Sequence, residues 1–436
     1  MQKTGLFARL VRGAGAALAV QIFSAVTVYS SQVLLARWMG TAEYGIYDYA
    51  NSISIVGAFI AGFGLPTAAL RFISAYNAQG DWAHLSGMIG GSWRQLLIAS
   101  CFVSCGGTAI WLRLNAEPGL GAYAIPLLLG IWTIPSLTLI NLQREVIRGF
   151  QQIILSFSPS LILQPLLLVI MAAVWRLQQD LNSTILMMLS LLSVLVALAI
   201  QWQLFQQNLD ARIRHTRPVY EVAKWWKVAL PLMLLDGSHM ILSHTDTLMI
   251  GAFLSAREVG IYSAALKTSA WVPFILKSIN AVAAPLIASL YAQGDRQGLQ
   301  QLISTIARWM FYPALVTAMG LIYFAQPVLQ LFGPEFIAAK GALIVLILGQ
   351  LVNVGAGSVG YLMTMTGYQN QSALVMVVSA LANVILNLMG IHFFGIIGAA
   401  IATALSMAMW NIWLYSLVLQ KLGVRPSILD AFRANS

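Results

Sequence analysis

Charged residues are scarce in this chain of 436 residues. Asp, Glu, Lys and Arg together make up 9% of it, whereas soluble domains contain about 25%. Apolar types make up 59%, and the mean hydropathy is +0.79. A soluble fold of this length could not cover its surface with so few charges, so lipid has to solvate much of it. The composition therefore predicts a membrane protein.

The sequence also has few residues with the chemistry of catalysis or metal binding. Its two cysteines, Cys101 and Cys105, lie one helical turn apart in an apolar run without a nearby His, which is typical of packing and not of a metal site or a disulfide framework. The chain has no Gly-Lys-Ser/Thr nucleotide-binding loop and no long polar gap for a soluble catalytic domain. We therefore expect a protein that is not an enzyme and that needs no cofactor.

The net charge of +10 could suggest a nucleic-acid partner, but the positions of the basic residues argue against one. They lie in short gaps between long apolar runs, which is how membrane topology is encoded. Basic residues at the cytoplasmic surface also gain roughly 1 kcal/mol each from anionic lipids. The charge pattern thus predicts contact with membrane lipids.

The apolar runs predict an all-α polytopic membrane protein, because a spanning helix needs about 20 apolar residues. The first run follows Lys3, Arg9 and Arg12 and continues to about Ala36 without a small-residue cleavage site, so we interpret it as an uncleaved span. A tight turn near Gly395 separates the last two runs. The twelve predicted spans are 14–36, 46–70, 88–112, 120–142, 153–175, 183–205, 228–253, 260–286, 302–325, 336–360, 372–393 and 395–419.

The orientation follows from the basic residues. If the N-terminus is cytoplasmic, cytoplasmic loops and flanks contain most of them, including Arg144, Arg148 and Arg212, whereas the outer side keeps few, such as Arg113 and Arg176. This asymmetry predicts that both termini are cytoplasmic.

The sequence repeats itself at an offset of about 215 residues. Three short segments recur in the same order: EYGIY at 43–47 as EVGIY at 258–262, YNAQGD at 76–81 as YAQGD at 291–295, and RGFQQ at 148–152 as TGYQN at 366–370. Six spans return each half to its starting side, so the repeat is parallel. We predict a six-helix lobe at 1–210, a basic cytoplasmic linker at 211–227 and a second six-helix lobe at 228–436, with the substrate path between the lobes.

These segments also carry a resemblance to a known family. LLARWMGTAEYGIYDYA at 34–50, GFGL at 62–65, RFI at 71–73 and GIIGAAIAT at 395–403 resemble the polysaccharide transporter family. That family includes O-antigen and capsule flippases of the multidrug/oligosaccharidyl-lipid/polysaccharide exporter superfamily. The first half lacks a clear counterpart of the GIIGAA segment.

The resemblance implies twelve helices around a cavity that opens alternately to each side of a bacterial inner membrane. It implies that the substrate is an undecaprenyl-diphosphate-linked oligosaccharide repeat unit. It also makes the polysaccharide polymerase machinery an expected partner.

Basic residues within or beside the spans are candidates for binding that anionic substrate. Lys267 and Lys277 lie ten residues apart in one predicted span, about 80° apart in azimuth on a continuous helix, and Pro273 lies between them. They could pair with phosphate oxygens in a wet cavity. Alternatively, Lys277 reaches the surface and Lys267 pairs with an aspartate. Arg37 and Arg71 flank the second span and either receive the anionic headgroup or anchor the interface.

Acidic residues in the seventh span are candidates for ion coupling. A charge at a helix centre costs ~2.5–3.5 kcal/mol on insertion scales, so it usually faces a cavity. Asp246 and Asp236 lie seven and three residues from His239 and could share a helix face with it. We predict that this group binds the H⁺ or Na⁺ that drives transport. The alternative is a structural Asp–Lys ion pair between the seventh and eighth helices.

Two other functions remain open. A cation-coupled drug or metabolite exporter of the same superfamily would have the same spans and repeat. A membrane-embedded polysaccharide polymerase or transferase would belong to another class, but such enzymes usually have a long external loop or clustered catalytic carboxylates, and this sequence has neither.

Overall fold

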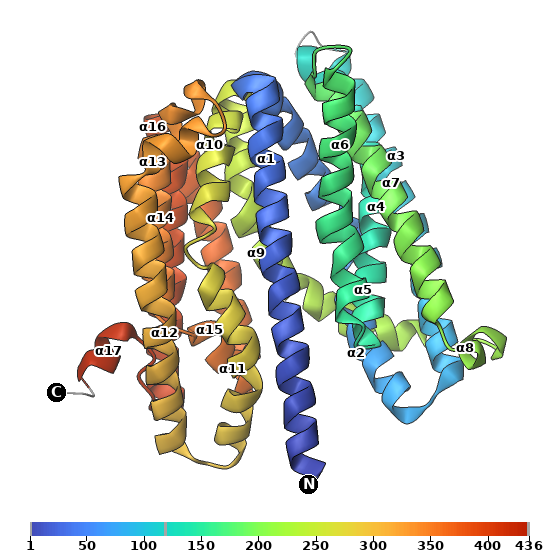
Figure 1. Ribbon diagram of the computed structural model, residues 1–436, viewed down its shortest axis with the longest axis vertical. Helices are drawn as coiled ribbons and strands as arrows, with labels where there is room; N and C mark the ends of the chain where they lie inside the picture. Colours follow the sequence, from blue (N-terminus) through green and yellow to red (C-terminus); the bar gives the residue numbers. More distant parts are fainter. Residues whose placement is uncertain (1, 117–119, 434–436) are drawn as a thin grey trace. The chain divides into compact units, whose positions relative to one another are not determined.

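The computed structural model describes the backbone of residues 2–116 and 120–433, and the side chains at 2–19, 235, 281–282 and 431–433 lie outside this description (Figure 1). The predicted flank residues Lys3, Arg9 and Arg12 are among those side chains. Every regular element in the described part of the chain is a helix, which confirms the predicted all-α class. The helices form two compact units, 1–240 and 241–436.

The first unit contains the helices up to the first part of α9. They are α1 (Gln2–Gly62), α2 (Leu65–Gln79), α3 (Trp82–Asn115), the short η1 (Gly121–Tyr123), α4 (Ala124–Gly149), α5 (Ile153–Ser158), η2 (Pro159–Leu163), α6 (Gln164–Arg176), α7 (Ser183–Asn208), α8 (Ala211–His215) and α9 (Val222–Phe253). Helix α4 packs against α1, α2, α3 and α7 and so forms the centre of this unit.

The second unit begins within α9. It continues with α10 (Ala256–Ser269), α11 (Phe274–Ala292), α12 (Arg296–Tyr323), α13 (Ala325–Gln330), η3 (Pro334–Ala339), α14 (Lys340–Gly355), α15 (Val359–Met365), α16 (Gln369–Leu422) and α17 (Ile428–Arg433). Helix α14 packs against α10, α12 and α16.

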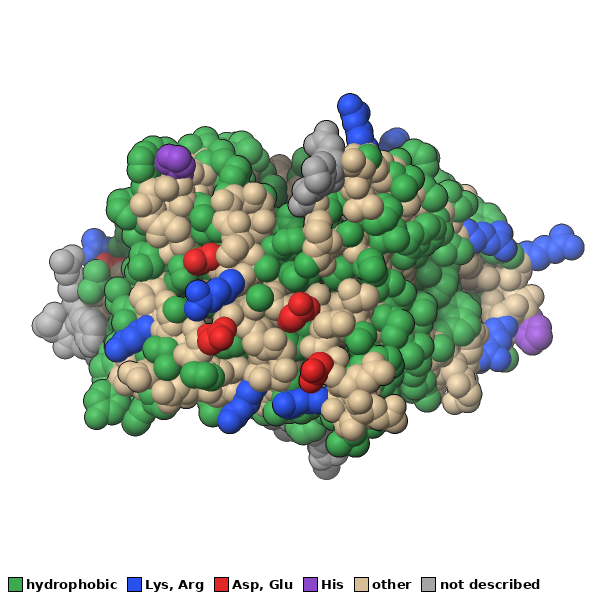
Figure 2. All heavy atoms as spheres, turned by 90° about the horizontal axis from the view of Figure 1, so that it is seen from above, with side chains coloured by type: hydrophobic (Ala, Val, Ile, Leu, Met, Phe, Trp, Pro, Cys, Tyr) green, Lys and Arg blue, Asp and Glu red, His purple; other side chains and the backbone are tan. Residues whose placement is uncertain are grey.

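Many of these helices are suited to lipid. Within the described residues, seven helices are long and apolar enough to cross a membrane, or up to nine if each of two bent pairs is one span. Large apolar side chains stay exposed, including Phe102 at 79%. Figure 2 shows hydrophobic side chains over much of the outline and charged ones on the face toward the viewer. The chain is a multi-pass membrane protein, and the count of twelve spans stays a prediction.

Two long helices are each interrupted by a glycine. Helix α1 has non-helical dihedrals at Gly40 (φ 76°), and α16 has them at Gly395 (φ 57°). A Cβ on Gly398 would lie 1.8 Å from the carbonyl oxygen of Gly390, so the chain folds back on itself around Gly395 and the two backbones touch. The sequence predicted a turn at this position. Small residues permit such close helix packing in a membrane.

Two predicted continuous spans are instead broken. The predicted span 46–70 is interrupted between α1 and α2, which meet at 51°, and Gly64 lies at the break with a φ of 72°. The predicted span 260–286 is interrupted between α10 and α11, which meet at 47°, with Pro273 just before α11. Proline lacks an N–H and clashes with the preceding turn, which favours a break. The estimate that Lys267 and Lys277 lie 80° apart on one helix was therefore wrong.

The second repeated segment has the same local structure in both copies. Gly80 and Gly294 have φ angles of 69° and 72°. The following residues, Asp81 and Asp295, cap α3 and α12 by accepting the N–H of the residue three positions later. Asp is a preferred N-cap because its carboxylate satisfies a free helical N–H. The two copies of this segment thus share a turn and an N-cap, and the repeat of whole lobes stays a prediction.

Candidate functional site

The second unit buries one acidic side chain within a polar network. The Asp246 carboxylate, on α9, is only 2% exposed. Its Oδ2 accepts hydrogen bonds from Thr403 Oγ1 at 2.6 Å and from the Tyr262 hydroxyl. Its Oδ1 accepts one from Asn387 Nδ2 at 2.9 Å. Three donors offset part of the cost of burying a negative charge, which an isolated carboxylate could not bear in an apolar interior.

The break at Gly395 brings these donors together. Asn387 precedes it and Thr403 follows it, so the two parts of α16 both reach Asp246. Asn383 lies one turn before Asn387 on the same helix face. Its Nδ2 donates to Thr403 Oγ1 at 3.3 Å and to Ser406 Oγ at 3.0 Å. The network is therefore built by α9, α10 and both parts of α16.

The network also contains oxygens without a hydrogen-bond donor. Asn383 Oδ1 and Asn387 Oδ1 are buried, and neither has a donor in the described part of the chain. Unsatisfied buried oxygens are costly and call for an explanation such as an ion or a water molecule. Carboxylate, amide and hydroxyl oxygens are the ligands that hard cations prefer. The residues present thus fit a monovalent cation, and a proton on Asp246 would neutralise the same charge.

A transition metal does not fit the same place. No group of three His, Cys, Asp or Glu side chains with metal-ligand spacing occurs among the described residues. The donors around Asp246 are oxygens and amides, whereas zinc sites use Cys and His.

The structure gives the two predicted coupling acids different partners. Asp246 bonds to Tyr262, Asn387 and Thr403, whereas Asp236, half-buried in the first unit, accepts a hydrogen bond from Thr67 Oγ1 at 2.8 Å. His239 is exposed in that unit. A role in coupling remains a prediction for all three, and the geometry favours Asp246.

The predicted substrate-binding cations occupy four helices. Arg37 is exposed on α1 and Arg71 on α2, both in the first unit. In the second unit, Lys267 is half-buried in the last turn of α10, and Lys277 is exposed in the first turn of α11. The break between α10 and α11 thus separates the two lysines. Their contact with substrate stays a prediction.

Signs of the network are visible in the sequence, although Asp246 is its only member among the predicted site residues. Asn383 and Asn387 are polar residues four positions apart in a predicted span, 372–393. Tyr262 ends the repeated EVGIY segment, and Thr403 ends the GIIGAAIAT segment. Polar residues at helical spacing in an apolar run usually face a partner or a cavity.

The first unit has a different arrangement at the corresponding positions. The offset of about 215 aligns Tyr47 with Tyr262 and Ser31 with Asp246. Ser31 Oγ donates to the Thr27 carbonyl oxygen at 2.7 Å. The described residues of the first unit bury two acids, Asp48 on α1, directly after Tyr47, and Glu145 on α4. At the position that corresponds to Asp246, the first unit thus has a hydroxyl in place of a carboxylate.

A second polar cluster, on the predicted linker, joins it to α2 and α3 in the first unit. Glu221 Oε2 accepts hydrogen bonds from the Tyr76 hydroxyl at 2.7 Å and from Lys224 Nζ at 2.8 Å. The His84 ring lies between two acids, with Nδ1 at 2.6 Å from Asp81 Oδ2 and Nε2 at 3.8 Å from Glu221 Oε1. We name these five residues the linker cluster.

The linker cluster predicts a pH-dependent contact. The hydrogen bond from Lys224, followed by that from Tyr76, lowers the pKa of Glu221 below its ordinary value. Because the pKa is lowered by folding, the ionised Glu221 stabilises the contact fully at a pH above its pKa in the unfolded chain, about 4.3. This stabilisation is lost as the pH falls through the pKa of Glu221 in the folded protein. Hydrogen exchange of the Val219 amide, which donates to the Ala83 carbonyl oxygen at 3.1 Å, measures this contact.

At neutral pH we expect Glu221→Gln to speed this exchange about two- to fivefold, the range of an exposed ion pair. Rates corrected for the intrinsic pH effect should rise in the wild type at acid pH and stay level in the variant. Asp180→Asn, at an exposed acid in another loop of this unit, is the control. Equal protection in the variant and the wild type at neutral pH would contradict the role of Glu221.

The fold is that of a known superfamily. An inward-facing multidrug resistance MATE family transporter of the MOP superfamily matches 97% of this chain and 100% of its own, with a TM-score of 0.73 and 13% identity. The lipid II flippase MurJ, in an inward closed conformation, matches 95% of this chain and 88% of its own, with a TM-score of 0.71 and 15% identity. At these identities the likeness shows the fold alone. The chain is thus a helical membrane protein with the fold of the MOP superfamily.

The family is shown by sequence. The model of the polysaccharide biosynthesis protein family matches residues 10–291, and the chain belongs to that family. The MatE family model matches residues 231–389. A probable low-salt glycan biosynthesis flippase of Haloferax volcanii is 28% identical over 167 residues, or 38% of this chain. The match covers 35% of the length of that relative, about a third. These relatives and neighbours are flippases and transporters, not enzymes.

Proposed function

We propose that this chain is a flippase that moves an undecaprenyl-diphosphate-linked oligosaccharide repeat unit across a bacterial inner membrane by alternating access. The observation that carries the proposal is the match of the polysaccharide biosynthesis protein family over residues 10–291. The Haloferax relative, named as a probable glycan biosynthesis flippase, supports the same activity. The translocated units would supply the synthesis of O-antigen, capsule or exopolysaccharide, with the polymerase machinery as a partner.

The proposed architecture has twelve spans with both termini cytoplasmic. Residues 1–210 and 228–436 form six-helix lobes, and 211–227 form the linker. The interruptions at Gly40 and Gly395 support this count, because each divides a helix too long for one crossing into two parts. A lobe pair of this kind transports by moving one half against the other.

The proposed driving force is a cation bound at Asp246. Binding of H⁺ or Na⁺ neutralises the buried carboxylate, and its release restores the charge, so the packing of α9 and α10 against α16 depends on occupancy. Arg37, Arg71, Lys267 and Lys277 are the proposed contacts of the diphosphate. A basic side chain in a wet cavity stabilises phosphate by charge-assisted hydrogen bonds.

A cation-coupled multidrug or metabolite exporter is the second candidate. The MatE family match supports it, because residues 231–389 include Asp246, Asn383 and Asn387. The two candidates differ in cargo and share the coupling site. No observation favours the third alternative, a polysaccharide polymerase or transferase.

Reconstituted vesicles distinguish the two candidates. We expect vesicles containing the protein to expose an undecaprenyl-diphosphate-linked oligosaccharide, loaded on the inner leaflet, to an external glycosidase within minutes, whereas protein-free vesicles protect it. We expect that the vesicles do not accumulate ethidium under the same ion gradient. Ethidium accumulation without movement of the lipid-linked sugar would support the exporter and overturn the flippase.

A further inference from the structure

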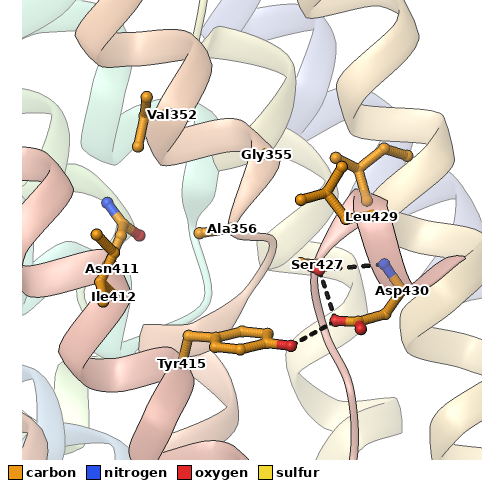
Figure 3. Close-up of a pocket in the computed structure, with 10 residues that line it drawn as sticks. Val352, Gly355, Ala356, Asn411, Ile412, Tyr415, Ser427, Leu429 and Asp430 are labelled. Atoms are coloured by element: carbon orange, nitrogen blue, oxygen red, sulfur yellow. Dashed lines mark hydrogen bonds between the residues drawn. The ribbon is translucent and has the colours of Figure 1, made fainter.

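A cavity of about 480 Å³ lies in the second unit, at the C-terminal end of α14. Its walls come from α14, the second part of α16 and α17, and Figure 3 shows the side chains that line it. Its volume falls within the range of small-molecule sites, about 300–1,000 Å³. Neither the proposed transport path nor the Asp246 network uses these residues.

One end of the cavity is acidic. Asp430 is 9% exposed, and its Oδ2 accepts hydrogen bonds from the Tyr415 hydroxyl at 2.7 Å and from Ser427 Oγ at 2.5 Å (Figure 3). Within the described part of the chain, its Oδ1 meets no hydrogen-bond donor. Among the described side chains, none of those that line the cavity is basic. A ligand with a cationic donor would complete this site, and a purely anionic one would be repelled.

Apart from Asn411, the remainder of the cavity is apolar, and it is open to the surroundings of the protein. Ile412 and Leu429 line it and are 63% and 71% exposed. Gly355 and Ala356 leave space at the wall because they have little or no side chain. In a membrane protein, apolar side chains with such exposure contact lipid chains.

An exposed basic residue comes shortly before the acidic residue in the chain. Arg425 is exposed and lies two residues before Ser427, which lines the cavity. Its backbone is held on both sides by Gln300 of α12, at 2.7 and 3.0 Å. The site therefore combines a buried carboxylate with apolar walls, and the exposed Arg425 comes five residues before that carboxylate in the chain.

We propose that this cavity binds one zwitterionic aminophospholipid, of the phosphatidylethanolamine class. Its ammonium group donates to Asp430 Oδ1, its phosphate pairs with Arg425, and an acyl chain lies along Ile412 and Leu429. The acyl chain leaves one apolar environment for another, so the headgroup contacts decide which lipid is retained. The bound lipid attaches α17 to α14 and α16.

Native mass spectrometry of the full chain tests this proposal. The protein is reconstituted in nanodiscs of equal phosphatidylethanolamine and phosphatidylglycerol, extracted and examined for retained lipid. We expect one retained phosphatidylethanolamine in the wild type. Asp430→Asn, which removes the charge but keeps the shape, should lower its occupancy about tenfold, as expected for a lost charge-assisted hydrogen bond. Ala356→Phe should lower it as much by filling the cavity.

Glu335→Gln is the matched control, because it removes an exposed acid near the opposite end of α14. We expect this variant to retain the lipid as the wild type does. Unchanged melting temperatures show that the variants are folded. Wild-type retention in both Asp430→Asn and Ala356→Phe would overturn the proposal. Equal retention of phosphatidylglycerol would also overturn it, because the selection of an ammonium group would be absent.

Discussion

Replacing Asp246 by Asn is expected to abolish ion-driven transport while the protein still folds. The amide keeps the shape of the carboxylate but has no charge to be neutralised by H⁺ or Na⁺. One of its two polar atoms becomes a donor, so at least one hydrogen bond that the carboxylate accepts from Thr403, Tyr262 or Asn387 has to be lost or reversed. A lost hydrogen bond to a buried group costs about 1–3 kcal/mol, so the melting temperature should fall moderately.

The measurement is the transport rate in vesicles as a function of an imposed Na⁺ or pH gradient. We expect at least a tenfold loss of the gradient-dependent rate, in line with the loss of ~1.4 kcal/mol or more of cation binding. Addition of the coupling ion should raise the melting temperature of the wild type and leave the variant unchanged, because ligands stabilise only the state that binds them.

Two further variants identify the contribution of the charge itself. Tyr262→Phe removes one donor but keeps the acid, so we expect a smaller loss of rate. Asp236→Asn changes another acid of α9, which bonds to Thr67 and not to the Asp246 network. We expect this variant to keep most of the dependence of the transport rate on the ion gradient. If Asp246→Asn responded to both gradients as the wild type does, Asp246 would have no part in coupling.

The helical architecture could be predicted because its cause is local. Runs of about 20 apolar residues encode spans directly, and a glycine such as Gly395 in an otherwise apolar run indicates a turn. The breaks between α1 and α2 and between α10 and α11 were harder to predict. Apolar residues continue through both, and Pro273 is equally compatible with a kinked continuous helix. Hydropathy does not show where the helix axis changes direction.

The candidate ion site was predictable only in part. Asp246 could be identified because a charge in an apolar run is visible in the sequence. Its partners could not, because Asn387 and Thr403 lie 141 and 157 positions away along the chain. Helical spacing suggested His239, a neighbour on the same helix, whereas the hydrogen bonds come from α10 and α16. The pairing of Glu221 with Tyr76, 145 positions apart, was missed for the same reason.

Replacing Lys267 and Lys277 together by Ala is expected to stop the movement of an anionic lipid-linked substrate. A charge-assisted hydrogen bond contributes about 1.5–3 kcal/mol, so each single replacement should lower the rate by roughly tenfold or more. Because the break at Pro273 places the lysines on separate helices, they act at different points of the path. The double variant should then lose about a hundredfold, as expected for independent sites.

The measurement is surface polysaccharide in cells that produce normal amounts of each variant, together with lipid-linked oligosaccharide on the inner leaflet. The double variant should lose the polymer and accumulate its precursor. Lys340→Ala, which removes an exposed lysine at the start of α14, is the control and should export normally. Lys277→Arg should keep most activity, because the positive charge remains. Full export by the double variant would exclude both lysines from the mechanism and leave Arg37 and Arg71 as the cations able to meet the diphosphate.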